Sequence, residues 1–433
     1  MNSLGRITDI PSFGVPGTAS GLPANRLGAV KTAICEGVAR HANAHFPRRL
    51  RSIVLTGSLA RSEATCLERA ESFEILGDAE FFLVFVDKAD LPCSSEIESV
   101  AQEAEATLRG QAIHCHISLG AVHPRYFRRL RPNVFSYELA ACGQVVWGDR
   151  EILNLIPSLS PAEIPLEDGW RTLCNRLIEQ LEAVEEVSAR PSACALLHYR
   201  TVKLYLDMTT SLLVFLRAYE PSYFRRAEKL SLLACDPSGK ERFPFPLPPF
   251  AEQVAACTAY KLSGKPHTDL LPGKDDLAGV LRFWKRSVSF ARQLWRWELT
   301  RLTGGWEPFS DHVLMKKWMR TQRLSDRIRG WLHVVRKCGW GRSRSHWLRW
   351  AKLGWRGSPR YCLYEVASHA SFRLPEIVGE SEGRTISDPY WRTLCTGVPL
   401  CEAALDNTNG TTWQDLVRSV AANYRGFLTD TRA

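Results

Sequence analysis

Two short segments hold the residues whose types and spacing could do chemistry. Gly57 and Ser58 follow the apolar run Ile53–Thr56, and Asp78 and Glu80 open a second apolar run. If the second run is a strand, residues two apart point to the same face, so both carboxylates would face one way. Two carboxylates on one face suit Mg²⁺, which proteins usually hold through one or two carboxylates together with substrate phosphates.

The glycine–serine pair is suited to binding phosphate. Gly57 lets the backbone approach a ligand closely, and Ser58 offers a hydroxyl and a backbone amide at the start of a helix. Arg61, one helical turn later, could neutralise further phosphate charge. The simpler interpretation is an ordinary strand-to-helix turn and two solvated carboxylates. The order of the two segments, and the apolar residues after Glu80, favour a joint phosphate and metal site.

Alternating strands and helices must position these residues. The Gly57–Ser58 turn would end one strand, and Asp78 would begin a central strand that is apolar on both faces beyond its first turn. Residues 66–76 have mixed charges and no clear period, so we expect a loop or a short helix there. The other expected elements are strands over 52–56, 78–86, 112–119 and 144–147, and helices over 24–46, 59–64, 96–109 and 134–141.

The two segments together resemble a known family. Residues 57–63 read Gly-Ser-Leu-Ala-Arg-Ser-Glu and resemble Gly-Ser-x-Ala-Arg-Gly-Glu, the bacterial form of the phosphate turn in polymerase-beta-type nucleotidyltransferases. Residues 78–80, Asp-Ala-Glu, resemble that family's carboxylate pair. The resemblance covers about residues 25–150. It implies transfer of a nucleoside monophosphate from ATP or another nucleoside triphosphate to an acceptor, with pyrophosphate leaving. The carboxylates would hold two Mg²⁺ ions, and the glycine–serine pair the β- and γ-phosphates.

The chain departs from the family pattern in three places. Residues 65–77 look like an insertion, and Ser62 replaces the usual glycine. Active members often carry a third carboxylate on a later strand, but residues 113–118 contain no acid. His114 and His116 would share one face of that strand and could take the place of the acid. Imidazole is a poor ligand for Mg²⁺ and suits softer metals.

Without the third acid, the general base that activates the acceptor is unidentified. Glu63 or Glu74 could reach the site from elsewhere in the domain. A zinc cluster is disfavoured because His114 and His116 would face away from Cys115 on a strand.

Long helical patterns follow residue 168, over 170–188, 193–219, 276–302 and 413–427. Lys203 and Asp207 are four residues apart on the second of these helices and share a face, so a solvated ion pair is the simple interpretation. In larger nucleotidyltransferases a helical domain closes the cleft, and a lysine from it often meets the triphosphate. By that resemblance Lys203 is a further nucleotide-binding candidate.

Positive charge is concentrated in residues 282–360. This stretch holds 20 Lys and Arg against four Asp and Glu, and ten of the 14 Trp, in a chain whose net charge is +10. Tryptophan interleaved with arginine could bind nucleic acid by stacking and charge. It could also lie on an anionic membrane surface or meet an anionic glycan-type acceptor. The third interpretation is a helical subdomain with tryptophan in its core and solvated arginine outside.

The bulk composition is that of a globular protein with more than one core. The chain has 433 residues, which predicts two or three domains. No uncharged apolar run is long enough for a transmembrane helix. The N-terminus has no apolar signal core, and the 13 Cys form no Cys-x-x-Cys pair. We therefore expect a cytoplasmic protein, with peripheral membrane attachment as an alternative.

The expected fold class is α+β. A lead over 1–24 precedes a small mixed-sheet nucleotidyltransferase-like domain over 25–150. A helical domain over 168–302 would close the cleft, followed by a basic, Trp/Arg-rich and helical region over 303–433. The expected activity is nucleotidyl transfer, either to an unknown acceptor or, as in antitoxin-type members, to a partner protein. The alternative is a catalytically impaired nucleotide-binding or scaffold protein with a basic surface for an anionic partner.

Overall fold

The chain forms two compact units, which are described separately. Unit 1 comprises the described residues up to Pro165 together with 216–231 and 254–269, and unit 2 comprises the remainder. The computed structural model describes residues 24–69, 71–236, 243–265, 269–305, 309–378, 389–399 and 412–427. Apart from its last residue, the lead expected over 1–24 lies outside these residues.

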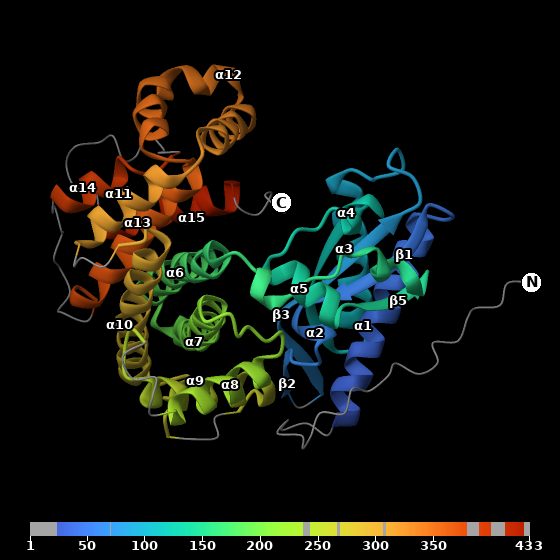
Figure 1. The fold of residues 1–433 in the computed structure, drawn as a ribbon. Coiled ribbons are helices and arrows are strands. Elements are labelled where there is room, and N and C mark those ends of the chain that lie inside the picture. Colours follow the sequence, from blue (N-terminus) through green and yellow to red (C-terminus); the bar gives the residue numbers. More distant parts are fainter. Residues whose placement is uncertain are drawn as a thin grey trace, which may run out of the picture. The chain divides into compact units, whose positions relative to one another are not determined.

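Unit 1 is built on a five-stranded mixed sheet around one long strand (Figure 1). The first half of β3 (Ser72–Phe85) pairs antiparallel with β2 (Thr65–Arg69), and its second half pairs antiparallel with β1 (Leu50–Thr56). β4 (Ile113–Val122) runs parallel along the opposite edge of β3, and β5 (Gln144–Gly148) pairs antiparallel with β1. The α+β class and the mixed sheet are therefore as expected.

Both faces of this sheet are covered beyond the start of β3. Phe81 and Leu83 pack in the core that α1 (Ala24–His45) and α3 (Ser94–Gly110) cover. Phe82 and Val84 pack with residues of α4 (Arg125–Arg128), α5 (Val134–Cys142) and the turn that follows β5. By strand alternation, Asp78 and Glu80 lie on the Phe82 face. The helices of unit 1 are α1 (Ala24–His45), α2 (Gly57–Ala60), α3 (Ser94–Gly110), α4 (Arg125–Arg128) and α5 (Val134–Cys142), with 3-10 turns over Arg150–Leu155 and Pro161–Glu163.

Two expected elements of unit 1 were wrong. Residues 66–69 and 72–76 belong to paired antiparallel strands, in which Cys66 pairs with Ile75 and both side chains are buried. The charged residues between them hid this alternation in the sequence. The helix expected over 59–64 is the single turn α2, because Ser62 takes a left-handed conformation with φ of 58° that no helix can continue.

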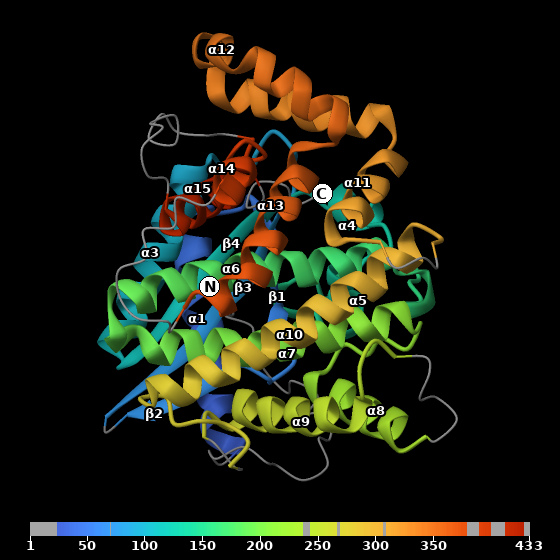
Figure 2. The same cartoon turned by 90° about the vertical axis from the view of Figure 1, so that its left-hand side faces the viewer.

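Unit 2 is helical (Figure 2). Aromatic side chains lie in its core. Trp170 is fully buried and stacks on Tyr361 with ring centroids 5.6 Å apart. Its helices are α6 (Leu166–Ala189), α7 (Cys194–Phe215), α10 (Leu277–Leu302), α11 (Asp311–Thr321), α12 (Leu324–Arg356), α13 (Pro359–Arg373), α14 (Pro389–Cys395) and α15 (Trp413–Phe427). Within the described part of the chain, no helix is both long and apolar enough to cross a membrane.

The division between the units differs from the boundaries expected from the sequence. Most of α8 (Tyr223–Cys235) and the second half of α9 (Leu247–Ser263) belong to unit 1 rather than to a separate helical domain. One contact that joins α9 to the sheet is a hydrogen bond of 2.7 Å, which Thr65 of β2 donates to the carbonyl of Lys261. Residues 270–302 group with the chain beyond them, so no boundary falls at 303.

Candidate functional site

The structure brings the glycine–serine turn and the carboxylate pair together. Thr56, the last residue of β1, is the register partner of Glu80 on β3. Gly57 follows with φ of 71°, a conformation that favours glycine. A Cβ at this position would lie 3.1 Å from Oε2 of Glu80. The Glu80 carboxylate therefore occupies the space that any other side chain at position 57 would need.

Asp78 lies on the same face as Glu80, directly after a bulge. Between the pairs Glu74–His114 and Asp78–His116, β3 uses two more residues than β4. Gly77, with φ of 111°, lies within this bulge. Asp78 is exposed and Glu80 is half-buried. The two carboxylates therefore share one face of the sheet, as the sequence predicted.

The two candidate histidines lie at different places along β4. His116 is the register partner of Asp78, and Ser118 is that of Glu80. His114 lies before the bulge, beside Glu74. The register therefore brings His116, but not His114, next to the carboxylate pair, and β4 contributes no acid there.

Glu105 on α3 fixes the ring of His116. Nδ1 of His116 donates to Oε1 of Glu105 over 2.9 Å, and the backbone N–H of Ile117 donates to the same oxygen over 2.8 Å. A carboxylate that accepts from Nδ1 leaves Nε2 of a neutral imidazole as the basic nitrogen. The sequence did not single out Glu105, because nothing in its spacing distinguishes it from the other acids of that helix.

Contacts from two elements and one internal hydrogen bond fix the turn that follows Gly57. The carbonyl of Ala60 accepts from Nζ of the buried Lys31 on α1, over 3.2 Å, and from Nε2 of Gln144 on β5, over 2.8 Å. The N–H of Glu63 donates to the carbonyl of Ser58 over 2.9 Å. Burial lowers the pKa of Lys31. Ser62 stands where the bacterial pattern has glycine, and its left-handed φ gives a physical reason for glycine at that position.

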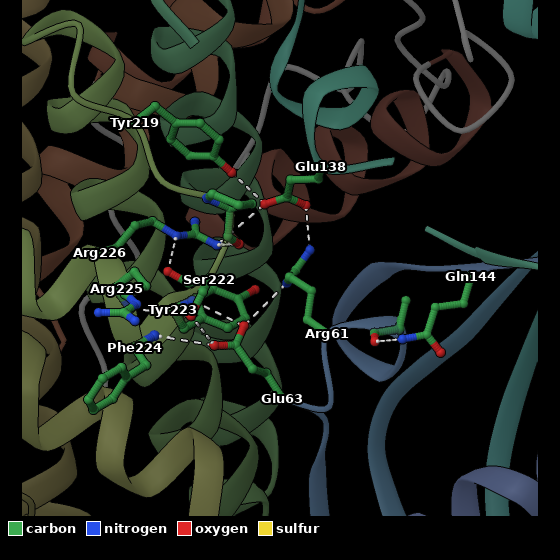
Figure 3. A network of polar contacts seen from close by, with 12 residues as sticks. Arg61, Glu63, Glu138, Gln144, Tyr219, Ser222, Tyr223, Phe224, Arg225 and Arg226 are labelled. Carbon is green, nitrogen blue, oxygen red and sulfur yellow. Dashed lines mark hydrogen bonds and ion pairs between the residues drawn. The ribbon is translucent and has the colours of Figure 1, made fainter. Parts of the chain in front are cut away.

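Arg61 lies at the centre of a buried polar network (Figure 3). Its guanidinium donates to Oε2 of Glu63 over 3.2 Å and to Oε2 of Glu138 on α5 over 2.6 Å. It also lies over the ring of Tyr223, and only 5% of its side chain is exposed. Burial alone would lower the pKa of Arg61, but the charges of Glu138, Tyr223 and Glu63 raise it above its usual value. Any contact between Arg61 and phosphate would require these ion pairs to open.

Glu63 joins the same network to the start of α8. Its carboxylate accepts from the hydroxyl of Ser222 over 2.7 Å and from the backbone N–H groups of Tyr223 and Phe224 over 3.0 and 3.3 Å. These amides belong to the first residues of α8, so Glu63 caps α8 from a distant part of the sequence. Its carboxylate is thus engaged at α8, although the sequence left it open as a general base.

Glu138 completes the network from the other side. Its Oε1 accepts from the hydroxyl of Tyr219 and, over 3.3 Å, from the fully buried Arg226. Burial raises the pKa of Tyr219. Arg226 in turn lies 4.3 Å from the ring centroid of Tyr223. The network therefore connects α2, α5 and α8 within unit 1, and sequence patterns gave no sign of these contacts between distant segments.

Lys203, the remaining nucleotide-binding candidate, lies on α7 in unit 2. Its Nζ lies 5.8 Å from the ring centroid of Tyr199, one turn earlier. Asp207 pairs with Nε of Arg176 over 2.6 Å. The role of Lys203 at the triphosphate stays a prediction from the resemblance.

The metal-binding capacity of the site rests on the carboxylate pair. Among the described residues, no group of three or more His, Cys, Asp or Glu side chains is placed to hold a metal ion. Comparison with protein-family models, curated proteins and solved structures finds no significant match.

Proposed function

We propose that this protein transfers a nucleoside monophosphate from a nucleoside triphosphate to an acceptor, with release of pyrophosphate. The observation that carries the proposal is the meeting of Glu80 and Gly57, with Asp78 on the same face. A backbone without a side chain thus lies beside two carboxylates on one face of the sheet. This combination is suited to a triphosphate and its metal ion.

Asp78 and Glu80 would hold Mg²⁺. Two carboxylates are enough, because protein-bound Mg²⁺ usually keeps water and substrate phosphate in its other positions. Bound Mg²⁺ would neutralise phosphate charge during in-line displacement. Gly57 and Ser58 would bind the phosphates through the backbone and the serine hydroxyl. Arg61, through Glu63 and Glu138, would keep the turn in its shape.

His116 is the proposed general base for the acceptor. It lies beside Asp78 in the strand register, where the family pattern suggests a third acid. Glu105 would hold the ring through Nδ1, so that Nε2 could accept a proton from the acceptor. Glu105 is then a positioning residue, in the way that carboxylates orient imidazole in other active sites.

A second candidate function is nucleotide binding without turnover. It is favoured by the absence of an acid from β4 at the positions beside Asp78 and Glu80. Such a protein would bind triphosphate and Mg²⁺ through the same pair but would release no pyrophosphate.

Pyrophosphate release separates the two candidates. The full chain is incubated with Mg²⁺ and each labelled triphosphate, with acceptors that include sugars, aminoglycoside-like polyols, nucleic acid ends and proteins. Release that disappears in Asp78→Asn supports transfer. Mg²⁺-dependent binding without release from any mixture supports the second candidate. Absence of triphosphate binding contradicts both.

A further inference from the structure

We propose that one side of α12 docks on an anionic phospholipid surface. The observations come from unit 2 alone and do not depend on the chemistry proposed for unit 1. Four of the tryptophans in the basic stretch are buried in unit 2, namely Trp284, Trp295, Trp318 and Trp350. Trp347 and Trp355 are 50% and 88% exposed, so a protein core does not explain them.

α12 folds back on itself. We call residues 324–336 the first arm and residues 346–356 the second arm. Trp331 and Trp350 meet with ring centroids 6.1 Å apart, and Arg327 donates to the carbonyl of Trp355 over 3.2 Å. Nineteen residues of straight helix would separate the two rings by roughly 28 Å. The arms therefore run antiparallel and side by side, as Figure 2 shows.

Helical geometry places matching positions of the two arms on the same side. Each residue advances a helix by about 100°, and antiparallel arms are related by a local two-fold axis that passes between them. Residues at equal steps from Trp331 and from Trp350 therefore point to the same side of the pair. One step before each lie Gly330, against Pro359, and Arg349, which donates to the carbonyls of Cys395 and Val398. This side of α12 packs on the rest of unit 2.

The opposite side is apolar, basic and exposed. We call it the outer face of α12. Ile328 and Trp347 lie three residues before Trp331 and Trp350, respectively. Arg329 and Leu348 lie two residues before these tryptophans. Arg336 and Trp355 lie five residues after them. Ile328 and Leu348 are 51% and 84% exposed, and Leu332, between them and Arg336, is 49% exposed. A shallow hollow of about 430 Å³ lies along the first arm, lined by Ser325, Ile328, Arg329, Leu332, His333 and Arg336.

The charge of α12 selects an anionic surface. Its 33 residues contain nine Lys and Arg and one acid, Asp326, which pairs with Arg329 at 3.6 Å. Lys352 adds an exposed cation beside the outer face. Tryptophan and leucine on such a basic helix insert at the headgroup level of a bilayer, while the cations attract anionic lipids. Nucleic acid would be bound by the cations and by stacking on tryptophan, which leaves the exposed aliphatic side chains Ile328, Leu332 and Leu348 unexplained.

Vesicle binding by the full chain tests the proposal. Phosphatidylcholine vesicles with and without phosphatidylglycerol are sedimented with the protein at low and high salt. We expect binding to the anionic vesicles only, weakened by salt. The triple variant W347S/L348S/W355S should bind at least about tenfold more weakly, because the inserting side chains supply most of the apolar burial. R329E/K352E should lose binding to a similar extent.

A matched control uses exposed apolar residues elsewhere. Val86→Ser with Leu232→Ser removes side chains that are 56% and 69% exposed, and binding should not change. Circular dichroism confirms that each variant folds. Absence of binding to anionic vesicles, or equal binding by W347S/L348S/W355S, overturns the proposal. Binding to single-stranded RNA or DNA in place of vesicles also overturns it and assigns the surface to nucleic acid.

Discussion

Gly57 lies against the carboxylate of Glu80, and a Cβ at position 57 would come within 3.1 Å of Oε2 and 3.2 Å of Cδ. Gly57→Ala should therefore displace the Glu80 carboxylate and strain a left-handed turn, at a cost of about 1–2 kcal/mol in stability. Mg²⁺-dependent affinity for triphosphate should fall about tenfold or more by calorimetry. Gly304→Ala is a matched control, because Gly304 has φ of 64° and no atom within 4 Å of an added Cβ. It should carry the strain and keep the affinity.

Arg61 is held by two carboxylates in a buried network. Arg61→Met leaves Glu63 without its cation and Glu138 with Arg226 alone, so unfolding in denaturant should require about 3–5 kcal/mol less than in the native chain. Arg61→Met with Glu63→Gln should recover part of that loss, because the carboxylate that lost its cation is removed. If Arg61→Met unfolds like the native chain and only binds triphosphate more weakly, Arg61 is instead a phosphate ligand.

His116 and Glu105 should act on turnover rather than on binding. His116→Asn should lower kcat for pyrophosphate release about 100-fold, a typical contribution of a general base, and leave triphosphate affinity unchanged. Glu105→Gln should lower kcat about tenfold and leave triphosphate affinity unchanged, because the imidazole loses the carboxylate that orients it. His114→Asn serves as the control, since His114 lies beside Glu74 instead. Equal rates for His116→Asn and His114→Asn would remove His116 from the mechanism.

His198 on α7 should make unit 2 sensitive to acid. Burial lowers its pKa from 6.5 to about 4, and the side chain is 1% exposed. Above about pH 6.5 the ring is neutral in both folded and unfolded chains. Between pH 6.5 and 4 only the unfolded chain takes up this proton, so stability is lost as the pH falls, by roughly 3 kcal/mol in all. The free energy of unfolding of His198→Leu, measured in denaturant, should fall correspondingly less between pH 7 and pH 4. If the difference in unfolding free energy between the variant and the native chain does not vary with pH, this assignment is contradicted.

Much of unit 1 could be predicted from its sequence. The apolar run after Glu80 and the glycine after Thr56 are local signals, and the strands and the turn follow from them. The spacing of Asp78 and Glu80 likewise determines that they share a face. The strand pairing of 66–69 with 72–75 was missed because charged residues are interspersed among its few apolar ones.

The partners of the turn could not be predicted. Glu63 meets Ser222 across 159 positions, and Arg61 meets Glu138 across 77. Such contacts depend on how helices pack, and no local pattern encodes them. The same holds for α12, where the antiparallel contact of Trp331 and Trp350 decides which tryptophans are buried and which are exposed.

The central claim is that Asp78 and Glu80 hold a metal ion for a triphosphate that lies at Gly57 and Ser58. The most direct measurement is calorimetric binding of each triphosphate with and without Mg²⁺ to the native chain and to Asp78→Asn with Glu80→Gln. We expect Mg²⁺-dependent binding of at least one triphosphate by the native chain, and its loss in the double variant without a change in the circular dichroism spectrum. Binding that is the same in both proteins, or that is independent of Mg²⁺, would contradict the account.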